Sequence, residues 1–161
     1  MCSSDLKVQQ HFFEGYNPYQ KHFPKKTKEL IKILLSDLTL ENDSLSYNDS
    51  LILKVDEAIV RQEDPQIFMI THILHISALI GEVFLAQSRD AEWYMENDGN
   101  GETWMPMIKV NRGNNDSGTI SFVQWLYEDM MHYAGVAGVV ESSYLSLKDF
   151  NNLNLLSPEK N

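Results

Sequence analysis

A run of twenty mostly apolar residues, 67–86, is the feature that most constrains how this chain can fold. The run is long enough to cross a lipid bilayer as one helix. It also carries Glu82, whose ionised carboxylate is costly inside a bilayer, so a buried core helix is the better interpretation. Asp64 and Pro65 form a typical helix start, because an N-cap carboxylate is followed by a residue that has no backbone donor. We therefore expect one long central helix over about residues 66–87.

The other patterns predict an α+β fold with several N-terminal helices around that central helix. Apolar residues recur at helical spacing over residues 25–38, and Asn48 or Asp49 can cap a second helix. In this second helix we expect Asp56, Glu57 and Arg61 on the side that faces solvent.

Beyond the central helix the period changes to that of a small antiparallel sheet. Two strands around the turn at 97–101 predict a hairpin over residues 92–110, with Pro106 at an edge or a bulge. Residues 111–118 are rich in turn formers and predict a loop. We expect a helix from Ser121, a strand within 136–147 and a last short helix at the C-terminus.

Length and composition indicate one domain in the cytoplasm. The chain has 161 residues, of which 43% are hydrophobic and 22% charged, as expected for a single core of ordinary size. Residues 1–24 hold five aromatic side chains without a sustained period, so we expect an N-terminal arm packed on a domain that spans 25–161. The single cysteine, Cys2, favours a reducing compartment, and no secretory signal is visible.

Charge is distributed unevenly along the chain. The formal net charge is −10, yet residues 1–35 hold six lysines against three acidic residues, and the remainder holds seven basic and twenty acidic residues. Such a surface repels nucleic acid and anionic membranes, so we expect neither as a partner. It suits a basic protein partner, and it would equally serve plain solubility.

Sequence motifs for enzymatic chemistry are missing. The sequence has no Gly-x-Ser-x-Gly elbow, no phosphate-binding loop, no dinucleotide fingerprint and no Cys-x-x-Cys pair. We therefore expect no catalytic residue and no cofactor.

Three ionisable residues in the apolar run support an alternative function, the binding of a metal ion or a small ligand. His72 and His75 can share one helical face, and Glu82 lies seven residues further along. Imidazole and carboxylate groups bind zinc or iron, with His132 as a further ligand, although two histidines on an apolar helix are more often core side chains. A metal- or small-ligand-binding protein, with or without enzymatic activity, is therefore the alternative to a protein-binding function.

A buried Glu82 also needs a partner, because an unpaired buried carboxylate is costly. Arg89, Lys109, Arg112 or a backbone amide could supply one.

The predicted hairpin carries most of the residues that we expect at a partner-binding surface. Trp93 and Tyr94 point to opposite faces of a strand, and Trp104 lies beside the turn. Protein interfaces favour such aromatic residues at their centres, and acidic residues around them would attract a basic partner. The expected binding residues are Glu92, Trp93, Tyr94, Glu96, Asp98, Glu102, Trp104, Asp116, Glu128 and Asp129.

A family resemblance rests on the run Leu79-Ile80-Gly81-Glu82-Val83-Phe84, then Ala91-Glu92-Trp93, then Pro106. It resembles a loose group of small bacterial domains of unknown function, in which a helix ends in Gly-Glu and a hairpin carries Trp and Pro on its two strands. Some of these look like immunity proteins that neutralise secreted toxins. The resemblance covers about residues 70–130. It implies an α+β fold without catalysis. Together with the acidic surface, it leads us to expect a cytoplasmic protein that occludes the active site of a basic toxin.

Overall fold

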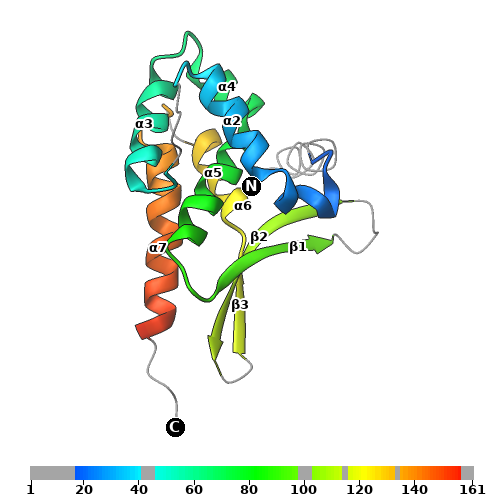
Figure 1. Cartoon of the computed structure of the whole chain (residues 1–161). Coiled ribbons are helices and arrows are strands. Elements are labelled where there is room, and N and C mark those ends of the chain that lie inside the picture. The colour runs from blue at the N-terminus through cyan, green and yellow to red at the C-terminus, as the bar shows by residue number, and fades with distance from the viewer. Residues whose placement is uncertain (1–16, 41–45, 98–102, 114–115, 133–134, 157–161) are drawn as a thin grey trace.

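The computed structural model describes residues 17–40, 46–97, 103–113, 116–132 and 135–156, and within them it confirms the α+β fold. These residues form seven helices and three strands (Figure 1). The elements in chain order are η1 (Gln20–Lys25), α2 (Thr27–Asp37), α3 (Asp49–Val60), α4 (Pro65–Thr71), α5 (Ile73–Ala86), β1 (Ala91–Asn97), β2 (Trp104–Gly113), β3 (Asp116–Ile120), α6 (Phe122–His132) and α7 (Val139–Leu156).

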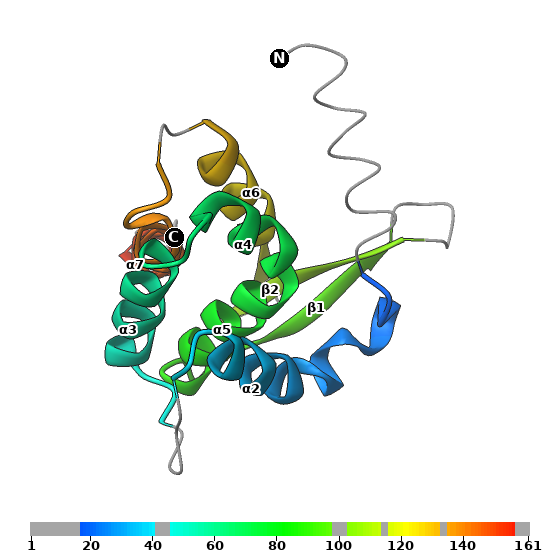
Figure 2. The same cartoon turned by 90° about the horizontal axis from the view of Figure 1, so that it is seen from above.

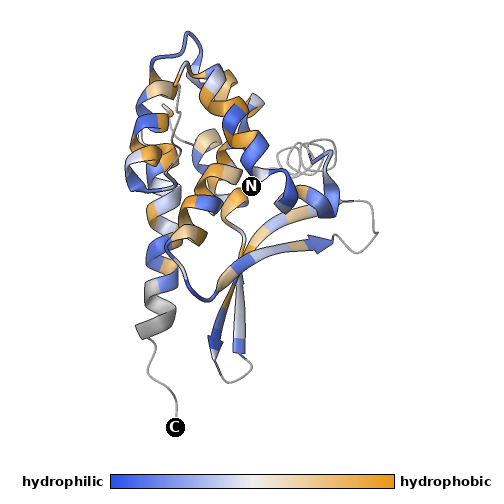
Figure 3. Ribbon diagram, viewed as in Figure 1, coloured by the Kyte–Doolittle hydropathy of each residue, from blue (hydrophilic) through white to orange (hydrophobic). Residues whose placement is uncertain are grey.

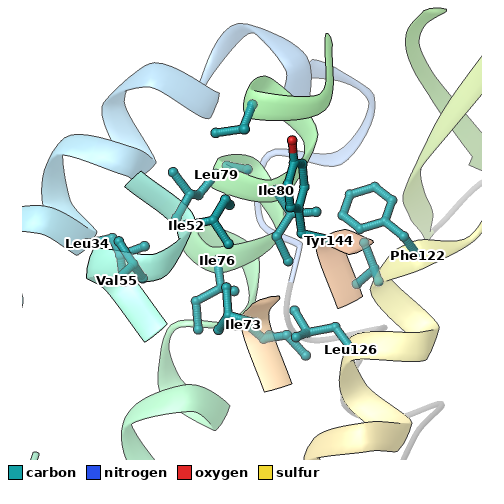
Figure 4. Packing of buried hydrophobic residues seen from close by; sticks show 14 of the residues in the cluster. Leu34, Ile52, Val55, Ile73, Ile76, Leu79, Ile80, Phe122, Leu126 and Tyr144 are labelled. Carbon is teal, nitrogen blue, oxygen red and sulfur yellow. The ribbon is translucent and has the colours of Figure 1, made fainter. Parts of the chain in front are cut away.

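The helices gather on one side of the molecule and the sheet on the other, with α5 at the centre of the helical part. α5 contacts α2, α3, α6, α7 and β1. It is hydrophobic almost throughout, whereas α2 and α3 alternate between apolar and polar positions, as amphipathic helices do (Figure 3). Its inward side chains meet those of the surrounding helices in one core (Figure 4). The labelled members of that core are Leu34, Ile52, Val55, Ile73, Ile76, Leu79, Ile80, Phe122, Leu126 and Tyr144.

The prediction of one long helix over 66–87 is wrong, because α4 and α5 are separate helices bent by 75° at His72. Here the His72 ring stacks on Phe68 with 3.9 Å between the ring centroids. Its Nδ1 lies 2.8 Å from the carbonyl oxygen of Phe68, and its Nε2 lies 2.8 Å from Oδ2 of Asp37. These contacts hold the chain where it turns. Apolar periodicity alone did not reveal the turn, since both helices are apolar.

The predicted helix starts agree with the structure. Asp64 Oδ1 accepts a hydrogen bond from the backbone of Ile67 at 3.1 Å, with Pro65 in the first turn of α4. Asn48, rather than Asp49, caps α3 by accepting from the backbone of Leu51 at 3.1 Å. Among the described residues, no single helix is long and apolar enough to cross a membrane, and only the bent pair α4 and α5 reaches that length together.

The sheet contains the predicted hairpin and one strand that was not predicted. β1 pairs antiparallel with β2, and β2 pairs antiparallel with β3, so the order is β1-β2-β3. The loop predicted over 111–118 is wrong, because β2 runs to Gly113 and β3 begins at Asp116. Gly113 has φ +80°, a conformation that favours glycine. Most of β3 faces solvent, so its composition is that of a turn.

The strand predicted within 136–147 is also wrong, because these residues belong largely to α7. Val140, Tyr144 and Leu147 are buried at 2% exposure or less, and their spacing matches one face of a helix. The expected last short helix is the end of the same α7. Gly138 has φ +79° and directly precedes α7.

The part of the N-terminal segment that the structure describes lies against the domain. Phe23 in η1 is fully buried, and its ring meets Trp93 edge-on with centroids 5.3 Å apart. The side-chain amide of Asn17 donates to the carbonyl oxygen of Trp104 at 2.7 Å. Residues 1–16, which hold the rest of the predicted arm, lie outside the described residues.

Candidate functional site

Trp93, one of the residues expected at a partner surface, is partly buried and packs against the core. Its indole nitrogen donates to Oε1 of Glu82 at 3.1 Å, and the hydroxyl of Thr27 donates to the same oxygen at 2.6 Å. Its ring lies between Phe23 and Phe122, with centroids 5.3 and 6.0 Å away. The side chain of Trp93 therefore connects β1 with η1, α5 and α6.

The carboxylate of Glu82 accepts hydrogen bonds from two uncharged donors, Thr27 and Trp93. Thr27 is only 1% exposed, so the carboxylate lies at the boundary of the core. The prediction that Arg89, Lys109 or Arg112 pairs with Glu82 is wrong, because the hydroxyl of Thr27 and the indole of Trp93 donate to its carboxylate instead. Spacing along the sequence does not reveal such contacts, since Thr27 is 55 residues away.

Gly81 allows the Trp93 ring to approach α5. A Cβ placed at Gly81 would lie 2.1 Å from Cη2 and 2.3 Å from Cζ2 of Trp93, distances that no real contact reaches. Any side chain at this position therefore displaces the ring. In this structure the Gly-Glu pair and the Trp that carried the family resemblance have a packing role.

The opposite face of β1 is the part of the predicted binding surface that does reach solvent. Side chains alternate along the strand, so Glu92, Tyr94 and Glu96 are exposed while Trp93 and Met95 are partly buried. Tyr94 is 39% exposed. We call the side chains of Glu92, Tyr94 and Glu96 the outer face of β1. The predicted residues Asp98 and Glu102 lie outside the described residues.

The remaining predicted binding residues lie on other elements. Trp104, at the start of β2, is partly buried, and Asp116 is exposed at the start of β3. Glu128 and Asp129 are partly exposed on α6, where Glu128 accepts a hydrogen bond from Gln124 at 3.1 Å. Burial, and to a lesser degree the neighbouring Glu128, raise the pKa of Asp129. The acidic residues are therefore spread over β1, β3 and α6.

The three metal candidates do not share one site. The rings of His72 and His75 are 5.2 Å apart, but His72 already faces Asp37 and Phe68, and Glu82 faces Thr27 and Trp93. Burial, with the neighbouring His72, lowers the pKa of His75. The further candidate, His132, is exposed at the end of α6.

No group of three His, Cys, Asp or Glu side chains within the described ranges is placed to hold a metal ion.

A pocket of about 490 Å³ lies between α3 and the start of α7, two helices that run side by side in Figures 1 and 2. Asp56, expected to face solvent, lines this pocket and is only 5% exposed. Its carboxylate lies near the backbone N–H groups of Gly138, Val140 and Glu141, but its Oδ1 has no hydrogen-bond partner among the described residues. Unpaired backbone donors at a helix start favour a negative group nearby, and Asp56 places one beside the N-terminus of α7 from a neighbouring helix.

Burial raises the pKa of Asp56 despite these donors, so the ionised form is disfavoured in the folded protein. A raised carboxyl pKa means that stability is lost as the pH rises through the folded pKa. We expect Asp56→Asn to raise the melting temperature at pH 7 by about 2–4 °C, the shift that about 1 kcal/mol gives in a chain of this size. The gain in melting temperature should vanish near pH 3, where Asp56 in the parent protein and asparagine in the variant are both uncharged. Asp56→Ala should lower the melting temperature at both pH values, because it removes a buried carboxyl group that lies beside the start of α7.

A second polar cluster joins α3, α5 and α7. Asp49 Oδ1 accepts from the hydroxyl of Tyr144 and from Nε2 of Gln87, the latter at 2.8 Å. Lys148 Nζ lies 3.2 Å from Oδ2 of the same carboxylate. The hydrogen bond from Tyr144 is the largest cause that lowers the pKa of Asp49, followed by that from Gln87. Burial, together with Asp49, raises the pKa of Tyr144 well above its usual range.

A lowered carboxyl pKa contributes stability above the unfolded pKa, and that contribution is lost as the pH falls through the folded pKa. We expect Tyr144→Phe to lower the free energy of unfolding by about 1 kcal/mol at pH 7. Urea titrations should show this difference shrinking below about pH 4, as the carboxyl of Asp49 becomes protonated. A difference that is constant from pH 7 to pH 2 would mean that the hydroxyl does not act through Asp49.

No protein-family model matches this chain, and neither a curated protein nor a solved structure is significantly similar to it. The resemblance to immunity proteins therefore stays a prediction.

Proposed function

We propose that this chain acts by recognising a basic protein partner through the outer face of β1. Its concrete form is a cytoplasmic immunity protein that neutralises a basic toxin by covering the active site of that toxin. The observation that carries the proposal is the placement of an exposed tyrosine between two exposed carboxylates, Glu92 and Glu96, on one face of a strand.

The chemistry of the outer face suits a cationic surface. Negative charges around an aromatic residue steer a basic partner and increase its association rate. Tyrosine adds a large contact area with one hydroxyl and little loss of conformational entropy. The charge of the chain beyond residue 35, with seven basic and twenty acidic residues, acts in the same direction.

The alternative of metal or small-ligand binding has less support. His72 and Glu82 already bond to protein groups, and their contacts explain the bend and the packing of α5. Elemental analysis of the purified protein separates the two functions, since stoichiometric zinc or iron that is lost in His75→Ala would favour the alternative.

The proposal is tested with the protein encoded by the gene directly upstream of this one, because an immunity gene normally lies next to the gene of its toxin. We expect the double change Glu92→Lys and Glu96→Lys to weaken binding by about tenfold or more, mainly through slower association. The loss should be smaller at high salt, where charges on a surface are screened.

A matched control changes Glu57 and Glu63 to lysine, which alters the net charge equally at exposed positions near the end of α3. The control variant should bind within about twofold of the parent protein. If the two double variants bind equally well, the outer face of β1 is not the binding surface.

A further inference from the structure

The backbone of β1 presents a row of hydrogen-bonding groups on the side away from β2. The backbone nitrogen of Asn111 donates to the carbonyl oxygen of Asp90 at 2.8 Å, so these two residues form a hydrogen-bonded pair just before β1. In an antiparallel pair, hydrogen-bonded and non-hydrogen-bonded positions alternate. Glu92, Tyr94 and Glu96 therefore bond to β2 through their backbones, and the residues between them direct their N–H and C=O groups outward.

The position of Pro106 independently supports this alternation. Pro106 lies opposite Met95 and has no N–H group. At a non-hydrogen-bonded position the missing N–H would point away from β1, so no ladder bond is lost there. β3 does not reach Pro106 either, because its pairing with β2 begins at Ile108. The outward backbone groups of β1 are therefore those of Ala91, Trp93 and Met95.

This edge is open within the described part of the chain. β1 is the first strand of the sheet and pairs with β2 alone, and no described strand lies along its other side (Figures 1 and 2). The side chains of Asp90, Glu92 and Glu96 beside the edge are exposed. An extended edge is a template for an additional strand, and specificity then comes from the side chains next to it.

We propose that a basic, extended segment of the partner pairs with β1 as a fourth strand of the sheet. This inference rests on the proposed function and specifies how the partner is held. Backbone hydrogen bonds to Ala91, Trp93 and Met95 supply the pairing, and lysine or arginine side chains of the added strand face Glu92 and Glu96.

Charge disfavours the other strands that could occupy this edge. In a second copy paired antiparallel and centred on Tyr94, Glu92 of each copy would lie opposite Glu96 of the other. Centred on Trp93, such a pair would place Asp90 opposite Glu96. Like charges directly opposite one another are destabilising. Residues 1–16 of the chain hold one lysine against two acidic residues and are not complementary either.

The test uses a synthetic seven-residue peptide of alternating lysine and valine, and the same peptide with glutamate in place of lysine. We expect the lysine peptide to bind at least tenfold more tightly than the glutamate peptide. On binding, amide hydrogen exchange measured by NMR should slow at least tenfold at Ala91, Trp93 and Met95. Exchange at Glu92, Tyr94 and Glu96 should stay unchanged, because their amides already bond to β2.

Matched N-methylated peptides test the backbone pairing directly. Two series of the lysine peptide are methylated on alternate amides, so that each series blocks one edge of the added strand. Only the series that blocks the edge facing β1 should lose binding. The inference would be overturned if both methylated series bound equally well or if the glutamate peptide bound as tightly as the lysine peptide. It would also be overturned if amide exchange slowed with rising protein concentration in the absence of any peptide.

Failure of this inference differs from failure of the proposed function. If charge reversal at Glu92 and Glu96 weakens the toxin complex while the amides of Ala91, Trp93 and Met95 stay unprotected in it, the partner binds the outer face without adding a strand. If charge reversal has no effect on the toxin complex, the proposed function itself is wrong.

Discussion

Gly81→Ala should lower the free energy of unfolding by about 3 kcal/mol, although alanine is the better helix former by about 1 kcal/mol. The added Cβ would lie 2.1 Å from Trp93 Cη2. The ring has little freedom to yield, because Glu82 holds its nitrogen and Phe23 and Phe122 lie against it. We expect the melting temperature to fall by about 6–12 °C, measured by circular dichroism.

The control for this change is Gly135→Ala. A Cβ at Gly135 would meet nothing within 4 Å, so stability should change by less than about 0.5 kcal/mol. The pair Gly81→Ala and Trp93→Phe tests the mechanism, because phenylalanine lacks the ring atoms that clash. The double variant should be less destabilised than the sum of its single variants, by about 1 kcal/mol or more. Purely additive effects would contradict a direct clash.

Patterns set by neighbouring residues allowed much of the fold to be predicted from the sequence. The helices α2 and α3 follow from apolar residues at helical spacing, and Asp64 with Pro65 marks the start of α4. The hairpin of β1 and β2 follows from a change of period around turn-forming residues. Each of these signals lies within about fifteen residues of the element that it predicts.

Contacts between distant residues explain what the sequence did not reveal. The bend at His72 depends on Asp37, which is 35 residues away, and burial of Asp56 depends on the start of α7. β3 was missed because only its last residue, Ile120, is buried, so its composition lacks the alternation of a half-buried strand. In each case the local pattern was ambiguous and tertiary packing decided the structure.

In the candidate site, the adjacent residues Trp93 and Tyr94 show the same limit of prediction from local sequence patterns. Alternation along a strand predicted that Trp93 and Tyr94 face opposite ways, but not which face the helices cover. Gly81 contained the missing information, since a glycine within an apolar helix indicates close packing against a neighbour, and Trp93 is that neighbour. Because Trp93 packs against the core, Tyr94 is the exposed aromatic residue of β1 that the proposed recognition of a partner would use.

The two aromatic residues should therefore separate stability from binding when each is changed to alanine. Trp93→Ala removes a ring that packs against Gly81, Phe23 and Phe122, and it deprives Glu82 of a donor. We expect a loss of about 4 kcal/mol, seen as a lower urea midpoint. Trp93→Phe should lose less, because it keeps part of the apolar contact and lacks only the indole donor.

Tyr94→Ala should change the free energy of unfolding much less, because the side chain is 39% exposed and belongs to the outer face. It should weaken the complex with the proposed basic partner by about 2 kcal/mol, roughly thirtyfold in Kd, as expected for an aromatic residue at the centre of an interface. Calorimetric titration of the folded variant measures this loss. Suppose that Tyr94→Ala binds the partner normally, whereas Trp93→Phe folds but does not bind. The partner would then not be recognised through the outer face of β1.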